Sequence, residues 1–130
     1  MHDHIMVVQA KPQTVIEIDS FIRSAVMAGM SDDERGTLVD YLARNPGLGD
    51  LVKETGGLRK LRWARPGEGK RGGYRAIYYY YDEDAPIFAF LVYGKNQQSD
   101  LSAAARKAAA KKVEQIKAGI KAERSARRTR

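Results

Sequence analysis

The sequence contains no cysteine and only two histidines, His2 and His4. Without cysteine the chain has neither disulfides nor thiolate metal sites. Both histidines lie in an N-terminal segment that we expect to be flexible, so the familiar nucleophile–histidine triads are not available. No group of residues has the spacing of a zinc site. We therefore expect no metal and no other cofactor.

Long hydrophobic runs are also missing. The longest apolar run, Pro86 to Tyr93, is far shorter than the roughly 20 residues that a membrane span needs. The first residues show neither a charged n-region nor an h-region, so we expect no signal peptide and a cytoplasmic protein. A length of 130 residues fits one domain. We place that domain at residues 14–124, between a disordered extension (1–13) and a basic tail (125–130).

Charge is plentiful and unevenly distributed. Residues 1–57 carry five cations and nine acids, residues 58–100 carry eight and five, and residues 101–130 carry ten and two. The net charge of +7 is therefore concentrated in the second half of the chain. A basic face on a small domain is the usual electrostatic footprint of a nucleic-acid-binding protein.

The first half of the chain predicts one strand and two helices. The alternating, β-branched residues Thr14 to Ile18 favour a strand. A helix capped by Asp19 or Ser20 follows and ends before Gly29. Ser31 and Glu34 have the spacing of a capping box, which predicts a second helix that runs to about Arg44. Residues 46–57 are rich in glycine and predict a loop.

The second half predicts a β-meander and a final helix. The three strands are expected at residues 58–65, 74–81 and 86–95, joined by short turns. Ile87 to Val92 is apolar on both faces, which predicts a strand in the middle of the sheet. Ser102 is the expected cap of a helix that runs to about Glu123. The predicted fold is α+β, with a small antiparallel sheet (the N-terminal strand plus the meander), two N-terminal helices and one C-terminal helix.

Two motifs that suggest ligand binding do not fit. The turn PGEGKRGG contains Gly69 and Lys70, but Arg71 stands where a phosphate-binding P-loop needs serine or threonine, and no helix follows the turn. The acids Asp82, Glu83 and Asp84 are successive residues in a tight connection, which is more typical of turn chemistry than of a metal site.

Cations gather on the first two strands of the meander. With strict alternation, Lys60 and Arg62 share one face of their strand while Leu61 and Trp63 share the other. Arg75 lies on the partner strand, and it joins Lys60 and Arg62 if the register of the hairpin allows it. Like charges on one sheet face repel, and a bound phosphate chain would relieve the repulsion.

Such a cluster can bind RNA or cleave it without a metal. Cleavage requires deprotonation of the 2′-OH, stabilisation of a charged phosphorane and protonation of the 5′-oxygen. Arginine suits the second task, and a lysine could orient or deprotonate the 2′-OH. A solvated basic strand without a ligand is the alternative.

The chain resembles the RelE/ParE superfamily of bacterial toxins from type II toxin–antitoxin systems, and within it the RelE/HigB branch. The resemblance spans about residues 14–123. Its most specific part is the GGLRKLRWA segment followed by GKRGGYRAIYY, together with FLVYGKNQQSDLS after the second turn.

The resemblance implies a metal-independent endoribonuclease that cuts mRNA in the decoding site of the 70S ribosome and leaves a 2′,3′-cyclic phosphate. It also implies a cognate antitoxin, often a helix-turn-helix protein. Family motifs place the catalytic basic pair at Lys60 and Arg62 and a further arginine at Arg75. The cations expected to position mRNA and ribosomal RNA, with one nearby amide, are Arg59, Arg65, Lys70, Arg71, Lys95 and Asn96.

One part of the family pattern is absent from this sequence. Some members carry a further arginine and then a tyrosine or histidine after the last strand, where this chain has Asn96 and Ser102. The identity of the general acid and base therefore stays open. Two other functions also stay open: a ParE-like poison of DNA gyrase, and a non-catalytic remnant that only binds an antitoxin.

Overall fold

The computed structural model describes residues 12–64, 73–94 and 101–129. Its elements follow the order β1 (Val15–Glu17), α2 (Asp19–Met27), α3 (Asp32–Arg44), β2 (Asp50–Leu51), β3 (Leu58–Trp63), β4 (Tyr74–Tyr79), β5 (Ile87–Gly94) and α4 (Ala103–Arg128). The α+β class and the predicted order of elements are confirmed.

The sheet is mixed and has five strands in the order β1-β5-β4-β3-β2. The prediction of a purely antiparallel, four-stranded sheet was wrong in two respects. β1 pairs with β5 in parallel, and the two-residue strand β2 adds to the outer edge of β3. The meander itself is antiparallel throughout, as predicted.

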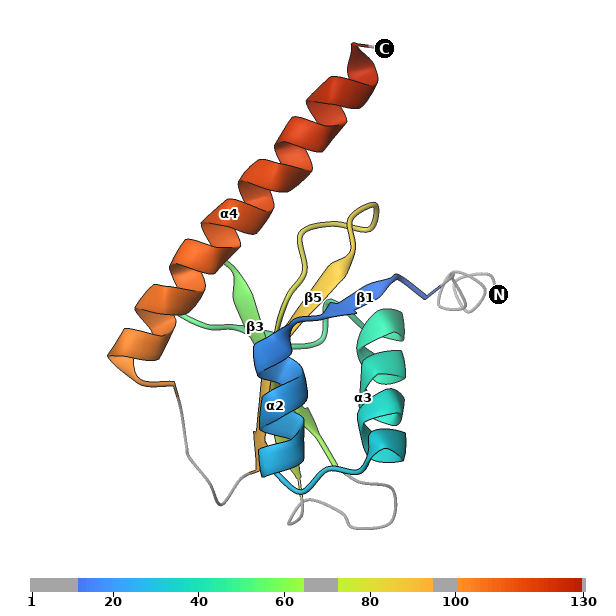
Figure 1. The fold of residues 1–130 in the computed structure, drawn as a ribbon, viewed down its shortest axis with the longest axis vertical. Helices are drawn as coiled ribbons and strands as arrows, with labels where there is room; N and C mark the ends of the chain where they lie inside the picture. Colours follow the sequence, from blue (N-terminus) through green and yellow to red (C-terminus); the bar gives the residue numbers. More distant parts are fainter. Residues whose placement is uncertain (1–11, 65–72, 95–100, 130) are drawn as a thin grey trace, which may run out of the picture.

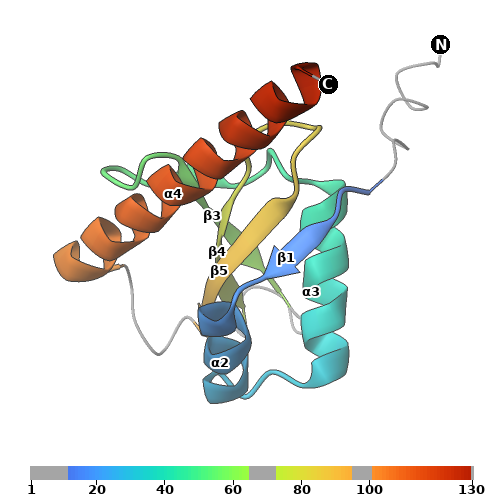
Figure 2. The same ribbon diagram turned by 45° about the horizontal axis from the view of Figure 1, so that its top comes forward.

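Helices cover both faces of this sheet (Figures 1 and 2). α2 and α3 lie on one side, and α4 crosses the other side. One hydrophobic cluster joins Phe21 of α2 and Leu38 of α3 to the sheet, and a second cluster joins Val113 of α4 to it. β5 contributes buried residues to both clusters, which confirms its predicted central position.

Local sequence signals explain the helix ends. Ser31 Oγ accepts a hydrogen bond from the Glu34 N–H at 3.1 Å while Glu34 Oε1 accepts one from the Ser31 N–H at 2.9 Å, so the predicted capping box is confirmed. Gly29 follows α2 with a φ of 77°, a conformation that glycine adopts without strain. Ser102 caps α4 by accepting from the Ala105 N–H.

The predicted cap of α2 was wrong, because Ile18 is the N-cap and no side chain bonds to the helix end. Ser20 instead donates to the Phe90 carbonyl at 2.6 Å, and Ser24 Oγ accepts from the Val92 N–H at 2.9 Å. Both partners belong to β5, beyond the point where its pairing with β1 ends. α2 thus satisfies backbone groups along an otherwise open length of β5.

α4 is longer than predicted and only lightly buried. It ends at Arg128 instead of about Glu123, and Val113 is its one buried residue within the described chain. Near its C-terminal end, Arg124 donates to both carboxylate oxygens of Asp82 at 2.9 Å and lies over the ring of Tyr81. None of the described helices, α4 included, combines the length and apolar character needed to cross a membrane.

Candidate functional site

The register of the β-hairpin brings the predicted cations together. Arg62 on β3 lies directly opposite Arg75 on β4, and Lys60 lies opposite Ile77. Residues paired in this way project from the same face of a sheet, with their Cβ atoms about 5 Å apart. Lys60 is two residues from Arg62, roughly 7 Å along the strand. We call Lys60, Arg62 and Arg75 the cation patch.

The cation patch lies on the α4 side of the sheet. Leu58 and Ile77, which share its face, are buried in the hydrophobic cluster that includes Val113 of α4. Arg62 is exposed, and Lys60 and Arg75 are half-buried. In the part of the chain that the structure describes, no carboxylate forms an ion pair with the side chain of Arg62 or Arg75. Both guanidinium groups are therefore available to an external anion.

Two residues that the sequence did not single out extend the cation patch across the sheet. Tyr93 on β5 lies opposite Arg75, so Arg62, Arg75 and Tyr93 form a row across three strands. Asp50 on β2 lies opposite Lys60 on the other side of β3. The alternation of β5 could have placed Tyr93 on this face, but no sequence signal identified the two-residue strand that carries Asp50.

Arg59 is separated from the cation patch. Strand alternation directs it to the opposite face of β3, where its guanidinium donates to the Gly49 carbonyl at 2.7 Å. In the same region the buried Tyr78 hydroxyl donates to the Pro46 carbonyl at 2.7 Å and accepts from the Gly49 N–H at 2.9 Å. Burial is the main cause that raises the pKa of Tyr78, so its hydroxyl stays protonated. Arg59 thus holds a loop in place, and its RNA-binding role stays a prediction.

Five of the residues predicted to contact RNA lie outside the described residues. They are Arg65, Lys70, Arg71, Lys95 and Asn96.

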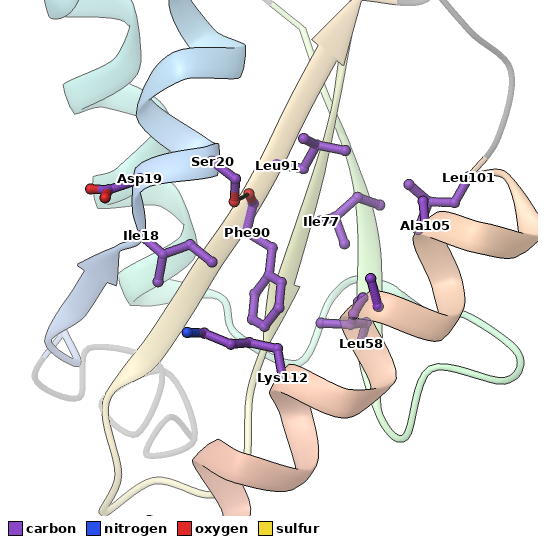
Figure 3. Close-up of a pocket in the computed structure, with 12 residues that line it drawn as sticks. Ile18, Asp19, Ser20, Leu58, Ile77, Phe90, Leu91, Leu101, Ala105 and Lys112 are labelled. Carbon is purple, nitrogen blue, oxygen red and sulfur yellow. Dashed lines mark hydrogen bonds between the residues drawn. The ribbon is translucent and has the colours of Figure 1, made fainter.

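A pocket of about 640 Å³ lies between α4 and the sheet (Figure 3). Its sheet side includes two residues that adjoin the cation patch: Leu58, the next residue to Lys60 on the same face of β3, and Ile77, which lies opposite Lys60 on β4. Figure 3 shows Phe90 and Leu91 facing the helix from β5 while Lys112 reaches over from α4. The lining is mainly apolar, so the pocket supplies shape and hydrophobic contact beside the charged surface.

The described residues contain no group of three or more acids or histidines that could hold a metal ion. In the acidic turn, Asp82 accepts hydrogen bonds from the N–H groups of Asp84 and Ala85 as well as from Arg124. These bonds confirm turn chemistry for this segment.

The chemistry available to the cation patch is that of its arginines. A guanidinium group can bind the non-bridging oxygens of a phosphate and can stabilise the charge of a phosphorane.

The chain matches one protein-family model over most of its length. That model is described as the RelE toxin of the RelE/RelB toxin–antitoxin system, and the match covers residues 17–126. The matched region includes every element of the sheet except the first two residues of β1, and it includes the whole cation patch.

Proposed function

The chain belongs to the RelE toxin family of toxin–antitoxin systems, and we propose that it is a ribosome-dependent, metal-independent endoribonuclease that inhibits translation by cutting mRNA. The convergence of Lys60, Arg62 and Arg75 on one accessible sheet face supports this proposal most directly. A strand pair that brings three cations to one face, and whose two arginines form no ion pair with a carboxylate of the described residues, fits a sugar–phosphate chain better than it fits a purely structural role.

The proposed reaction is an internal transesterification. The 2′-oxygen of one nucleotide attacks its own 3′-phosphorus and loses its proton, and the bond from phosphorus to the 5′-oxygen breaks. The products are a 2′,3′-cyclic phosphate and a 5′-OH that has gained a proton. Arg62 and Arg75 stabilise the additional negative charge of the phosphorane, and Lys60 orients or deprotonates the 2′-OH.

We add two positioning roles to this scheme. Tyr93 lies opposite Arg75 in the register of the sheet and is almost fully buried, so we assign it a role in positioning Arg75 and not in contacting the reacting atoms. Asp50 lies beside Lys60 and supplies the negative charge closest to that lysine in the register of the sheet. The proposed partners are mRNA, the ribosomal RNA of the 70S particle and a cognate antitoxin of the helix-turn-helix type. The proposed site of action is the cytoplasm.

The Arg75→Ala variant tests the catalytic assignment. We expect the rate of mRNA cleavage on programmed 70S ribosomes to fall at least ~100-fold, because one of the groups that stabilises the transition state is lost. Single-turnover cleavage with mapping of the mRNA ends measures the effect. Arg23→Ala is the matched control, since Arg23 is an exposed arginine on α2, outside the cation patch.

Different results identify the alternatives. If Arg75→Ala cleaves mRNA within a few-fold of the wild-type rate, the cation patch is not the catalytic site. Double-strand DNA breaks and an SOS response on induction, with intact mRNA, would establish a gyrase poison. Normal growth on induction of the wild-type chain would establish a non-catalytic, antitoxin-binding protein.

A further inference from the structure

Four of the six exposed cations of α4 lie on one side of the helix, and the other two, Lys112 and Arg127, lie on the opposite side. At 100° per residue, Lys107, Lys111, Lys121 and Arg128 fall within an arc of about 100°. All four are exposed. We call these four residues the α4 stripe. It runs for about 32 Å along the helix, at 1.5 Å per residue.

The α4 stripe is separate from the pocket. The α4 residues that line the pocket include Ala105, Ala109 and Lys112, which lie on the side of the helix roughly opposite to the α4 stripe. The stripe instead borders the side on which Arg106 approaches Glu54 at 3.9 Å. A ligand on the stripe and a ligand in the pocket would therefore occupy different surfaces.

The charges of the α4 stripe are not balanced within the helix. The one acid in the same arc is Glu114. Its Oε2 lies 3.6 Å from Nζ of Lys117, a residue that does not belong to the stripe. None of the four cations forms an ion pair with a carboxylate in the described residues. Like charges four residues apart, as in Lys107 and Lys111, lower helix stability by about 0.2–0.5 kcal/mol per pair. A bound polyanion would offset this repulsion.

The absence of large exposed hydrophobic side chains from α4 distinguishes the type of partner. Tight protein interfaces depend on buried aromatic or aliphatic anchors. Within the described residues, the large exposed hydrophobic side chains belong to other segments, with Val26 and Met27 of α2 at 67% and 80% exposure and Leu51 of β2 at 65%. α4 has none. Its outer surface is suited to a charged backbone, not to a protein partner.

The shape of α4 agrees with this assignment. Its C-terminal part extends past the edge of the sheet (Figure 1), which leaves the last turns open on several sides. The bidentate bond between Arg124 and Asp82 holds this projecting part to the body. Lys121 and Arg128 lie in this C-terminal part, whereas Lys107 and Lys111 lie in the part of α4 that precedes the buried Val113.

We propose that the α4 stripe binds the phosphate backbone of double-helical RNA and thereby anchors the protein to ribosomal RNA, separately from the cation patch that acts on mRNA. The choice of RNA rests on the proposed ribosome-dependent function. Phosphate contacts of this kind carry no sequence information, and they fix the position and orientation of a protein on its nucleic acid.

The test compares two triple variants of the full chain. One is Lys107→Gln/Lys111→Gln/Lys121→Gln, and the control is Arg23→Gln/Lys53→Gln/Lys112→Gln, which removes the same charge from exposed positions outside the α4 stripe. Binding to a 20-base-pair RNA duplex is measured by fluorescence anisotropy over a range of salt concentrations. The α4 variant is expected to bind about 10-fold more weakly, with a salt slope shallower by about three, and the control is expected to match wild type.

Circular dichroism first verifies that both variants retain native helix content. Equal loss of affinity in both triple variants would overturn the proposal, because it would show an effect of net charge alone. Tighter binding to a DNA duplex of the same length than to RNA would also overturn it. The proposed ribonuclease activity is judged separately: Arg75→Ala is expected to lower the rate of cleavage on the ribosome at least ~100-fold while it binds the RNA duplex within about 3-fold of wild type.

Discussion

Tyr78 shows how one residue connects the sheet to the loop after α3. Its ring is buried between β4 and the helices, and its hydroxyl bonds to both the Pro46 carbonyl and the Gly49 N–H. The next residue, Tyr79, is buried on the opposite face of the same strand. Neither ring is open for stacking on a base, and the tyrosine run therefore serves packing at these two positions.

Replacing Tyr78 by phenylalanine removes only the hydroxyl. We expect Tyr78→Phe to lower the free energy of unfolding by about 1–3 kcal/mol, because the Gly49 N–H and the Pro46 carbonyl lose their buried partner. Urea denaturation measures the change. Tyr80→Phe is the control, since Tyr80 is half-buried and its hydroxyl makes no hydrogen bond with the described residues. Equal losses in the two variants would show that the two bonds of Tyr78 are unimportant.

Sequence reasoning placed part of the candidate site correctly. Alternation along β3 put Lys60 and Arg62 on one face, which the structure confirms. The position of Arg75 depended on the hairpin register, because a shift of one residue would turn its side chain to the other face. Arg59 was included among the RNA contacts from its charge alone, although the same alternation directs it toward Gly49.

At the scale of elements, the loop between α3 and β3 is fitted closely to the sheet. A Cβ atom on Gly49 would lie 2.7 Å from the Tyr78 hydroxyl oxygen and 3.1 Å from Arg59 Cβ. The loop also carries β2, whose Asp50 pairs with Lys60. The packing at Gly49 thus contributes to the position of a neighbour of the cation patch.

Alanine at Gly49 tests this fit. We expect Gly49→Ala to lower the free energy of unfolding by about 1–3 kcal/mol, as is typical when atoms are added to a packed site. Gly47→Ala serves as the control, because a Cβ atom there meets nothing within 4 Å. Thermal melts of the two variants give the comparison. If Gly49→Ala lowered the melting temperature no more than Gly47→Ala does, the close fit at Gly49 would be contradicted.

Most elements could be predicted because their signals are local. The capping box of α3 and the alternation of β3 each involve neighbouring residues. The parallel pairing of β1 with β5 joins residues about 70 positions apart, and a strand pattern does not specify its partner. β2 has only two residues in a glycine-rich loop, too few for a periodic signal. The part of α4 beyond Glu123 begins with Arg124, whose bond to Asp82 reaches a segment about 40 residues away and leaves no local signal in the sequence.

At the scale of the molecule, α4 is joined to the body through few strong contacts. Hydrogen bonds from Arg124, followed by those from the Asp84 and Ala85 N–H groups, hold the pKa of Asp82 below its ordinary value of 3.8. A carboxyl group whose pKa is lowered in the folded state stabilises the protein above its unfolded pKa. That contribution is lost as the pH falls through the folded pKa, below about 4.

The sign of this effect gives a testable pH dependence. We expect wild type to have a higher urea midpoint than Asp82→Asn at pH 7, and the difference to shrink as the pH falls from 4 toward 2. Asparagine keeps the size of the side chain but has no proton to gain in this range. Glu83→Gln is the control, because Glu83 is exposed in the same turn. A constant difference between wild type and the asparagine variant across this pH range would exclude a charge-dependent anchor.

The bonds from α2 to β5 have a consequence for how partners can assemble with this protein. Ser20 and Ser24 already bond to the Phe90 carbonyl and the Val92 N–H. The edge of β5 beside Tyr93 therefore cannot form a ladder of backbone hydrogen bonds with an incoming strand. Any peptide that lengthens the sheet must attach beyond β2 or along the outside of β1. An inhibitor that covers the row from Arg62 to Tyr93 therefore has to lie across the strands. Its affinity must come from contacts with side chains and not from backbone pairing.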